Sequence, residues 1–513
     1  MDLPASSAPR QDLAPPPRPD DPPDAPPPAP PRLAGAWPFV VLGGALALYA
    51  LLAINQAAIW GRASWFARPR AGTDETGFLV AGYVAINAAL LALYAAIVRI
   101  SAGRTGEGWS AAVLGLPVLV LAGFAWVGPT FSVDVWSYLA HGATTLLPYD
   151  SDAYSTPPRL ISALPYGQEL LARGWNPAPG TSPYGPVWTL LESAIVGSGL
   201  GVDAGMHVIK AIGAGAAFGS AALVWRILGL VRPEARLAGT AAFLWNPVVV
   251  VELAGEGHID GLMVFLALLG LYGVLLARPA AGLVSTVAGG LVKYLPALFL
   301  LPQLAYLWRR ATGDRRAFVA GVLPALAIAA AMAGLAFLPF LGPHLFDGVL
   351  RSNAGGAWPL WPSVSGLVYS GLLSWFPALD QATGRTLLLG GVVGLVVLVQ
   401  SMRAATPERL IRACATIAVT YVYLVSAIFW PWYALLPIAF LVMEPGRRPW
   451  ILVLVLTAGS RLLAPLGALP ADVPFQGVFT WGTLAVVLIA LGTSALARLV
   501  PARGTAAGVV TAE

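Results

Sequence analysis

The sequence predicts an all-α polytopic membrane protein, and three observations support that prediction. Hydrophobic residues make up 57% of the 513 residues and charged residues only 11%, whereas a soluble domain carries about 25% charged residues. The apolar residues form a series of runs of membrane-spanning length. The arginines gather in short loops between these runs, which is typical of topology signals and not of a basic face that binds nucleic acid.

The two ends of the chain differ in composition from the part between them. Residues 1–36 are rich in proline and aspartate and poor in apolar residues, so we expect a disordered cytoplasmic tail. This tail lacks the basic region, short apolar core and cleavage site of a removable signal peptide. Residues 37–500 are predicted to form the transmembrane domain and residues 501–513 a flexible C-terminal tail.

The apolar runs set the expected number of spans, because about 20 helical residues cross roughly 30 Å of hydrocarbon. Proline ends or kinks a helix by removing a hydrogen-bond donor, and it splits two of the runs, at 293–296 and at 430–433. The total is then about 14 transmembrane helices. The runs cover residues 37–60, 77–99, 109–130, 206–230, 237–254, 259–277, 280–308, 318–341, 386–402, 410–443, 449–469 and 477–499.

The arginines predict the orientation of the chain. Short arginine-rich loops face the cytoplasm under the positive-inside rule, which places both termini inside a plasma-membrane protein. The spans then alternate correctly only if residues 186–199 form a helix that lies in the interface. The segments expected on the outer face are 131–186, 252–260, 293–296, 343–362 and 430–433. The deciding arginines are Arg99, Arg104, Arg226, Arg232, Arg236, Arg309, Arg310, Arg315, Arg316, Arg403, Arg409, Arg412, Arg447 and Arg448.

The longest polar interval after the tail, 131–186, contains the first candidate site residue and belongs to a predicted outer loop over 131–204. Asp134 follows the apolar run 111–126, so its carboxylate is expected at the membrane–water boundary, where lipid head groups lie. An ionisable group at this depth is costly unless it is solvated, paired or functional. The alternative is that Asp134 only caps the helix that follows it.

Three cations also fall on the predicted outer face. The only two lysines of the chain, Lys210 and Lys293, sit near the outer ends of apolar segments, and Arg351 lies in an outer loop. Each could reach nearby head groups without any specific role. Together they favour an anion at the membrane surface, most simply a lipid phosphate.

A second constellation consists of Glu256, His258 and Asp260. Because these residues alternate, an extended loop would point all three side chains to one side. We expect contacts with hydroxyls or a sugar, since a divalent cation needs more ligands than this short pattern supplies. Asp260 could alternatively cap the next helix. No cofactor is predicted, and the single cysteine, Cys414, excludes an intrachain disulfide or a cysteine metal site.

The chain lacks a phosphate-binding loop, a dinucleotide fingerprint and a soluble domain large enough for a nucleotide-sugar. An activated donor would therefore arrive through the membrane. A boundary carboxylate that acts as general base, with cations that offset charge on a departing phosphate, fits group transfer to a hydroxyl. The alternatives are a lipid-linked saccharide flippase or transporter, which should show paired repeats with broken helices, and a structural scaffold.

Several motifs together resemble a known family. They are Ser132 to Tyr138 (SVDVWSY), Ser182 to Pro186 (SPYGP), Leu244 to Pro247 (LWNP) leading to Glu252, the HIDG of 258–261, Val292-Lys293, and Trp430 to Tyr433 (WPWY). This combination is similar to the polyprenyl-phosphate-mannose-dependent α-(1→6)-mannosyltransferases of actinobacterial lipomannan synthesis, which are GT-C glycosyltransferases. The resemblance covers about residues 41–499.

The resemblance implies a GT-C bundle whose active site lies in the first large outer loop. It implies an inverting single displacement that moves a sugar, most simply mannose, from a polyprenyl phosphate to a glycan or glycolipid acceptor of the cell envelope. Asp134 would be the catalytic base, and Lys293 or Arg351 would meet the donor phosphate. Tyr184 would line the site, with Tyr138, Trp432 and Tyr433 as further substrate-binding residues.

Overall fold

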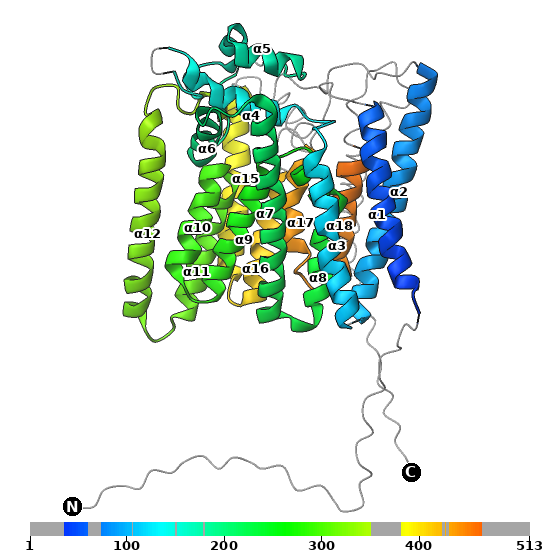
Figure 1. Ribbon diagram of the computed structural model, residues 1–513. Helices are drawn as coiled ribbons and strands as arrows, with labels where there is room; N and C mark the ends of the chain where they lie inside the picture. Colours follow the sequence, from blue (N-terminus) through cyan, green and yellow to red (C-terminus); the bar gives the residue numbers. More distant parts are fainter. Residues whose placement is uncertain are drawn as a thin grey trace, which may run out of the picture. The chain divides into compact units, whose positions relative to one another are not determined.

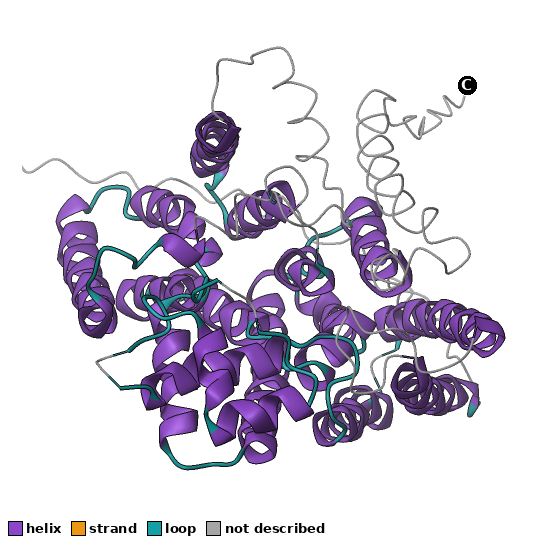
Figure 2. Ribbon diagram, turned by 90° about the horizontal axis from the view of Figure 1, so that it is seen from above, coloured by secondary structure: helices purple, strands orange, loops and turns teal. Residues whose placement is uncertain are grey.

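The computed structural model describes residues 35–59, 73–104, 106–148, 151–177, 180–349, 381–422, 426 and 430–463, and all regular elements in these ranges are helices (Figure 2). Seen from above, many of the helices are viewed nearly end-on, as expected for a bundle of helices that run in one general direction. The predicted all-helical membrane architecture is confirmed. Residues 1–34 of the predicted N-terminal tail, the C-terminal tail, Arg351 and the apolar run 477–499 lie outside the described residues.

Long apolar helices form the frame of the bundle (Figure 1). Among the described residues, five helices are long and apolar enough to cross a membrane, and one bent pair of helices makes a sixth candidate. Other predicted spans correspond to helices of only 11 to 16 residues, such as α9, α10 and α11, so the number of about 14 stays a prediction. The five long helices are α1 (Trp37–Ile59), α2 (Thr73–Gly103), α3 (Glu107–Trp126), α7 (Val202–Val231) and α12 (Arg315–Phe337).

The remaining helices complete the bundle. Proline occupies the first helical position of α6, α10 and α16, where its missing N–H costs nothing. These helices are α4 (Asp134–Gly142), α5 (Pro165–Ala172), α6 (Pro186–Gly197), α8 (Arg236–Leu244), α9 (Asp260–Leu275), α10 (Pro279–Val292), α11 (Leu300–Arg310), α15 (Gln381–Arg403), α16 (Pro407–Thr420), α17 (Leu435–Leu441) and α18 (Arg447–Ala458). Shorter turns include η4 (Val249–Gly255), η5 (Leu295–Phe299), η8 (Pro431–Ala434) and η9 (Gly459–Leu463).

The predicted break in the run 280–308 is present in the structure. Helix α10 ends at Val292, Lys293 is extended, and the chain re-enters a helix through η5 and α11. The second predicted break falls at η8, which leads directly into α17. The two breaks lie close together, since the Lys293 ammonium group lies over the Tyr433 ring.

A third break, at Asn246, joins α8 to η4 with a bend of 53°. The carbonyl groups freed by this break accept hydrogen bonds from buried tyrosines: Tyr94 donates to the Ala242 carbonyl (2.6 Å) and Tyr49 to the Trp245 carbonyl (2.7 Å). Such partners are required because no water can satisfy a backbone group there. The bend is thereby fixed, and it carries η4 to the candidate site.

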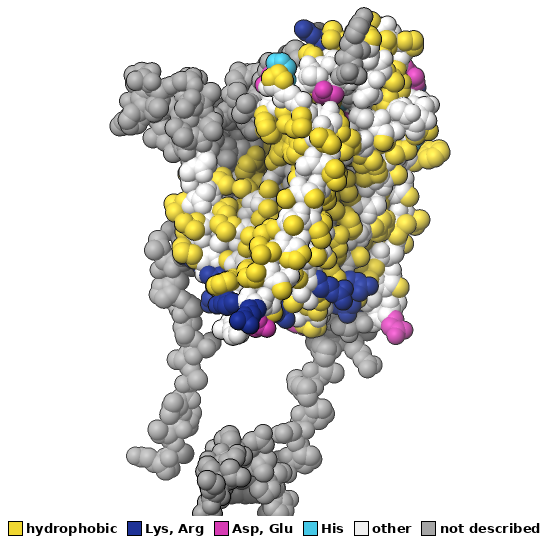
Figure 3. All heavy atoms as spheres, turned by 90° about the vertical axis from the view of Figure 1, so that its left-hand side faces the viewer, with side chains coloured by type: hydrophobic (Ala, Val, Ile, Leu, Met, Phe, Trp, Pro, Cys, Tyr) yellow, Lys and Arg dark blue, Asp and Glu magenta, His cyan; other side chains and the backbone are white. Residues whose placement is uncertain are grey.

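The elements of the first long loop, α4, α5 and α6, gather at one end of the bundle (Figure 1). Helix α6 has 12 residues, or about 18 Å at 1.5 Å per residue, which is too short to span a bilayer. This length agrees with a helix that does not cross the membrane. On the face drawn in Figure 3, most of the lysine and arginine side chains form a band at the opposite end, below a broad apolar belt.

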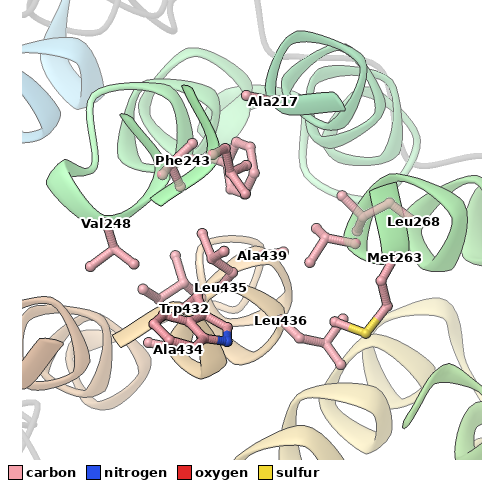
Figure 4. Close-up of a cluster of buried hydrophobic side chains, with 14 of the residues drawn as sticks. Ala217, Phe243, Val248, Met263, Leu268, Trp432, Ala434, Leu435, Leu436 and Ala439 are labelled. Carbon is pink, nitrogen blue, oxygen red and sulfur yellow. The ribbon is translucent and has the colours of Figure 1, made fainter. Parts of the chain in front are cut away.

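Close packing in the centre holds the site-bearing segments together. Side chains from α7, α8, α9 and the η8–α17 segment meet in one buried apolar cluster (Figure 4). The indole of Trp432 lies in this cluster and is only 5% exposed, which ties the η8 turn to the core. The labelled members are Ala217, Phe243, Val248, Met263, Leu268, Trp432, Ala434, Leu435, Leu436 and Ala439.

Candidate active site

Asp134 is the first residue of α4, and a buried glutamate fixes the turn that precedes it. The Glu256 carboxylate accepts hydrogen bonds from the backbone N–H groups of Phe131 (3.1 Å) and Ser132 (2.9 Å) and from the Thr130 hydroxyl (3.1 Å). Backbone N–H groups near the start of a helix need such acceptors. Glu256 therefore holds the chain at the point where α4 begins, and with it the position of Asp134.

The Asp134 carboxylate faces two side chains. Its Oδ2 atom lies 3.5 Å from the Tyr138 hydroxyl and 3.5 Å from His258 Nδ1. The Asp134 side chain is 24% exposed, whereas the His258 ring is fully buried. The N-cap position of α4 is Val133 and has no side-chain capping bond. The Asp134 side chain therefore does not cap α4.

His258 lies between two carboxylates. Its Nε2 atom is 3.3 Å from Glu252 Oε2, and its ring stacks on Trp432 with 3.7 Å between the ring centres. At 3.3 and 3.5 Å the two contacts are ion pairs and not well-aligned hydrogen bonds. Burial alone lowers the pKa of His258, but Asp134 and Glu252 outweigh it and raise that pKa to about 9. His258 is therefore a cation beside Asp134 at neutral pH.

The second charged pair of the site joins the break after α10 to the start of α9. Lys293 Nζ lies 2.9 Å from both carboxylate oxygens of Asp260 and 4.5 Å from the centre of the Tyr433 ring. The Asp260 side chain is 2% exposed and that of Lys293 is 22% exposed. The Lys293 ammonium group is therefore paired with a buried carboxylate, while part of the Lys293 side chain stays exposed.

An aromatic cluster of Tyr138, Tyr184 and Trp188 adjoins Asp134 through Tyr138 and the break after α10 through the Tyr184 loop. Tyr138 makes edge-to-face contacts with the rings of Tyr184 and Trp188, each at 5.2 Å between ring centres. Burial, and then the neighbouring Tyr184, Asp134 and Asp260, raise the pKa of the Tyr138 phenol. Tyr138 is thus close enough to both carboxylates to feel their charge. Asp134 and the Asp260 ion pair border one site.

The loop that carries Tyr184 is fastened to the break after α10. Gly185 N–H donates to the Val292 carbonyl (3.0 Å), and the Tyr184 carbonyl accepts from the hydroxyls of Tyr154 (2.8 Å) and Tyr294 (3.1 Å). These bonds connect a residue of the first long loop to the neighbours of Lys293, which is more than 100 positions away in the sequence. The SPYGP motif therefore serves to join two parts of the site.

We expect Gly185→Ala to damage this junction. A Cβ atom at position 185 would collide with the Leu291 carbonyl oxygen, and backbone cannot move aside as a flexible side chain can. Overpacking of this kind costs about 1–3 kcal/mol, so thermal unfolding in nanodiscs should begin at a lower temperature. Gly180→Ala, in the same loop with open space around its Cβ position, is the matched control. Equal stability of the two variants would contradict the tight contact.

Lys210 and Arg351 are the other two predicted cations. Lys210, in α7, is completely buried, and its ammonium donates a hydrogen bond to the carbonyl of Val127, the residue that follows α3. Arg351 lies outside the described residues. Of the two predicted anion-binding cations that the structure describes, Lys293 is the one whose sequence neighbours are hydrogen-bonded to the Tyr184 loop.

Glu256, His258 and Asp260 do not share one face, in contrast to the extended loop that their spacing suggests. Glu256 binds backbone amides, His258 lies between Asp134 and Glu252, and Asp260 pairs with Lys293. The chain departs from extended geometry because η4 is a π-helix and α9 begins at Asp260. Within the described residues, no group of three or more histidine, cysteine or acidic side chains is arranged to hold a metal ion.

Sequence reasoning missed Arg461. Its guanidinium is fully buried and lies 2.5 Å from Glu252 Oε1, so it extends the charged cluster around His258. A signal was present, because an arginine within the apolar run 449–469 is unusual and is a functional hypothesis by default. This signal is easily overlooked, because the many arginines at the ends of apolar segments indicate topology only.

Comparison with known proteins adds to this geometry. A family model described as the N-terminal domain of α-(1→6)-mannopyranosyltransferase matches residues 33–310, more than half of the 513-residue chain. The chain belongs to this mannosyltransferase family. The matched residues include Asp134, Glu256, His258, Asp260 and Lys293, and the suspected family resemblance is confirmed.

This chain is similar to α-(1→6)-mannopyranosyltransferase A from Mycobacterium tuberculosis. The two sequences are 30% identical over 198 residues, which is 37% of this chain and 36% of the relative. The aligned part thus spans about a third of that relative. No solved structure matches this chain. None of these comparisons supports the transporter alternative.

Proposed function

We propose that this protein is a membrane glycosyltransferase that moves a sugar, most simply mannose, from a polyprenyl phosphate to a hydroxyl of a glycan or glycolipid. Membership of the α-(1→6)-mannopyranosyltransferase family supports the reaction class. The bilayer supports the choice of donor, because a lipid carrier reaches a site at the end of membrane helices without a soluble nucleotide-binding domain. The catalytic loop is the segment 131–204, on the outer face of the plasma membrane.

One observation carries the assignment of roles. Asp134 and Lys293 are each about a quarter exposed, at 24% and 22%, while the charged groups that contact them are almost fully buried. We therefore assign to these two side chains the negative and the positive charge that face the ligand. A general base and a phosphate-binding cation are the two charges that glycosyl transfer from a lipid phosphate requires.

The reaction then proceeds as a single displacement. Asp134 accepts the proton of the acceptor hydroxyl while that oxygen forms a bond to the anomeric carbon of the donor sugar. The bond between the anomeric carbon and the phosphate oxygen breaks on the opposite face, and its electron pair leaves with the polyprenyl phosphate. Lys293 offsets the charge that grows on this phosphate. The configuration at the anomeric carbon is inverted.

The aromatic residues have supporting roles in this proposal. Tyr138 and Tyr184 offer ring faces and hydroxyls to the sugar and the acceptor, a combination suited to carbohydrate ligands. Tyr433, which lies under the Lys293 ammonium, and Trp432, which stacks on His258, hold the charged groups in place. No metal or cofactor takes part in this proposed mechanism.

A reconstituted assay tests this function. Purified protein in nanodiscs, given a polyprenyl phosphomannose and a short α-mannoside, should extend the acceptor by one mannose, detected by mass spectrometry together with free polyprenyl phosphate. A panel of lipid-linked glucose, galactose and arabinose donors identifies the sugar. The same lipids without acceptor distinguish transfer from hydrolysis. Movement of lipid-linked sugar across vesicles, with no extension of any acceptor, would reject the proposal in favour of a transporter.

A further inference from the structure

Four charged side chains alternate in sign along a buried row that begins at Asp134. Asp134 faces His258 at 3.5 Å, His258 faces Glu252 at 3.3 Å, and Glu252 faces Arg461 at 2.5 Å. All side chains of the row except Asp134 are fully buried. We name this set the charge row. It joins the start of α4 to η4 and to η9, which are far apart in the sequence.

We propose that Glu252 and Arg461 are positioning residues, which act through His258 to orient the Asp134 carboxylate. This inference rests on the proposed role of Asp134 as general base. Neither Glu252 nor Arg461 contacts substrate in this assignment. Their effect reaches the reacting hydroxyl only through the ring of His258.

Arg461 is held firmly enough to serve as the fixed end of the charge row. One terminal nitrogen of its guanidinium contacts Glu252, and the other donates a hydrogen bond to the Tyr83 hydroxyl at 3.1 Å. The second bond restrains rotation of the guanidinium. The same hydroxyl donates to the Arg461 carbonyl at 2.5 Å. A planar guanidinium with two partners has a defined orientation. The Glu252 carboxylate is thereby fixed from one side.

The local backbone supports this geometry. Glu252 lies in η4 and Arg461 in η9, and both segments are π-helices. A π-helical turn is rare and is frequently found at functional sites. Both partners of the innermost ion pair are therefore presented from unusual turns. A pair needed only for packing has no requirement for two such segments.

Energetics also favour a functional role. Burying ions costs several kcal/mol each, and replacing a buried ion pair by apolar residues is often neutral or stabilising. Stabilisation of the fold alone therefore does not explain why the charge row is charged. Neighbouring side chains of the charge row carry opposite charges. Asp134 is the member of the row with solvent access, and it faces the proposed substrate. The row supplies a fixed positive neighbour to that carboxylate.

The charge of His258 depends on the groups that face it. These are Asp134 from α4 and Glu252 from η4, with Glu256 close by and the Trp432 ring stacked on its face. A cation gains from stacking on an indole. Since the pKa of His258 is raised to about 9, the ring is positively charged at neutral pH and loses its charge as the pH rises through about 9.

The test is the pH profile of kcat for Glu252→Gln, measured with polyprenyl phosphomannose and an α-mannoside. Wild-type kcat should fall on the alkaline side near pH 9. Removing the Glu252 charge lowers the pKa of His258, so the alkaline fall should move toward neutral pH. The kcat at neutral pH should drop about 100-fold through misplacement of the base, with little change in the KM for donor. Glu252→Asp, which keeps the charge, should restore the position of the alkaline fall.

Two further variants make the outcome decisive. Glu444→Gln removes a carboxylate that pairs with Arg412 away from the site and should leave kcat and its pH profile unchanged. If Glu252→Gln does not accumulate as folded protein, Glu252→Gln/Arg461→Met removes both buried charges together and should show the same kcat loss and alkaline shift. An unchanged kcat, or an unshifted alkaline fall, in whichever variant folds would overturn the positioning role.

The same measurements separate this inference from the proposed function. If wild-type protein transfers mannose and Asp134→Asn is inactive, but Glu252→Gln behaves as wild type, then only the positioning role of Glu252 and Arg461 is rejected. If Asp134→Asn keeps full activity, the proposed base is wrong whatever Glu252→Gln does. In that case the charge row loses its assigned purpose as well.

Discussion

Asp134→Asn should reduce kcat by about 10²–10⁴-fold, the usual contribution of a general base. The amide has nearly the same size as the carboxylate, so the start of α4 should not move. It cannot accept the proton of the acceptor hydroxyl at neutral pH. Because the donor sugar phosphate is held by other groups in this mechanism, its affinity should change little. Turnover and donor binding, measured on the same nanodisc samples, give the two numbers.

Asp203→Asn is the matched control for this prediction. Asp203 lies near the start of α7, is 58% exposed and pairs with Arg173, so its loss removes an acidic charge with no contact to the charge row. Its kcat should equal that of wild type. Asp134→Glu, which keeps the charge on a longer side chain, should fall between wild type and Asp134→Asn. Full activity of Asp134→Asn would exclude Asp134 as the base.

Much of the architecture could be predicted because its causes are local in the sequence. Long apolar runs specify membrane helices, and the prolines near 296 and 431 correctly mark two breaks. The number of spans was harder to predict, because helices of 11 to 16 residues are formed within longer apolar runs. A hydrophobic run does not reveal where a helix ends inside it.

The site was harder to predict than the bundle, since its contacts join distant segments. The sequence singled out Asp134 by its boundary position and the family resemblance, and Lys293 with two other cations by their place on the predicted outer face, and their roles stay predictions. The carboxylate of Glu256 binds amides more than 120 positions earlier in the chain, which no spacing pattern reports. Arg461 contacts Glu252 across more than 200 positions. Long-range pairing decides which polar groups are structural and which remain available to a ligand.

Lys293→Ala should weaken donor capture more than it slows the chemical step. A hydrogen bond to a charged group contributes about 1.5–3 kcal/mol, so loss of the phosphate contact should raise the KM for donor about 10- to 100-fold. The effect should be largest at low donor concentration and should partly disappear at saturation. An alternative cause must be separated from it, because the substitution also leaves the buried Asp260 carboxylate without its ion-pair partner.

The variant Lys293→Met/Asp260→Asn separates these two causes. If Lys293 only neutralises Asp260, removing both charges together should return stability and donor KM to nearly wild-type values, because the cost of breaking a buried pair arises from the charge left behind. If Lys293 contacts the donor phosphate, stability should recover while the donor KM stays high. Recovery of both quantities would assign Lys293 to structure alone. Persistence of the KM defect in a stable double variant identifies the cation that faces the leaving phosphate.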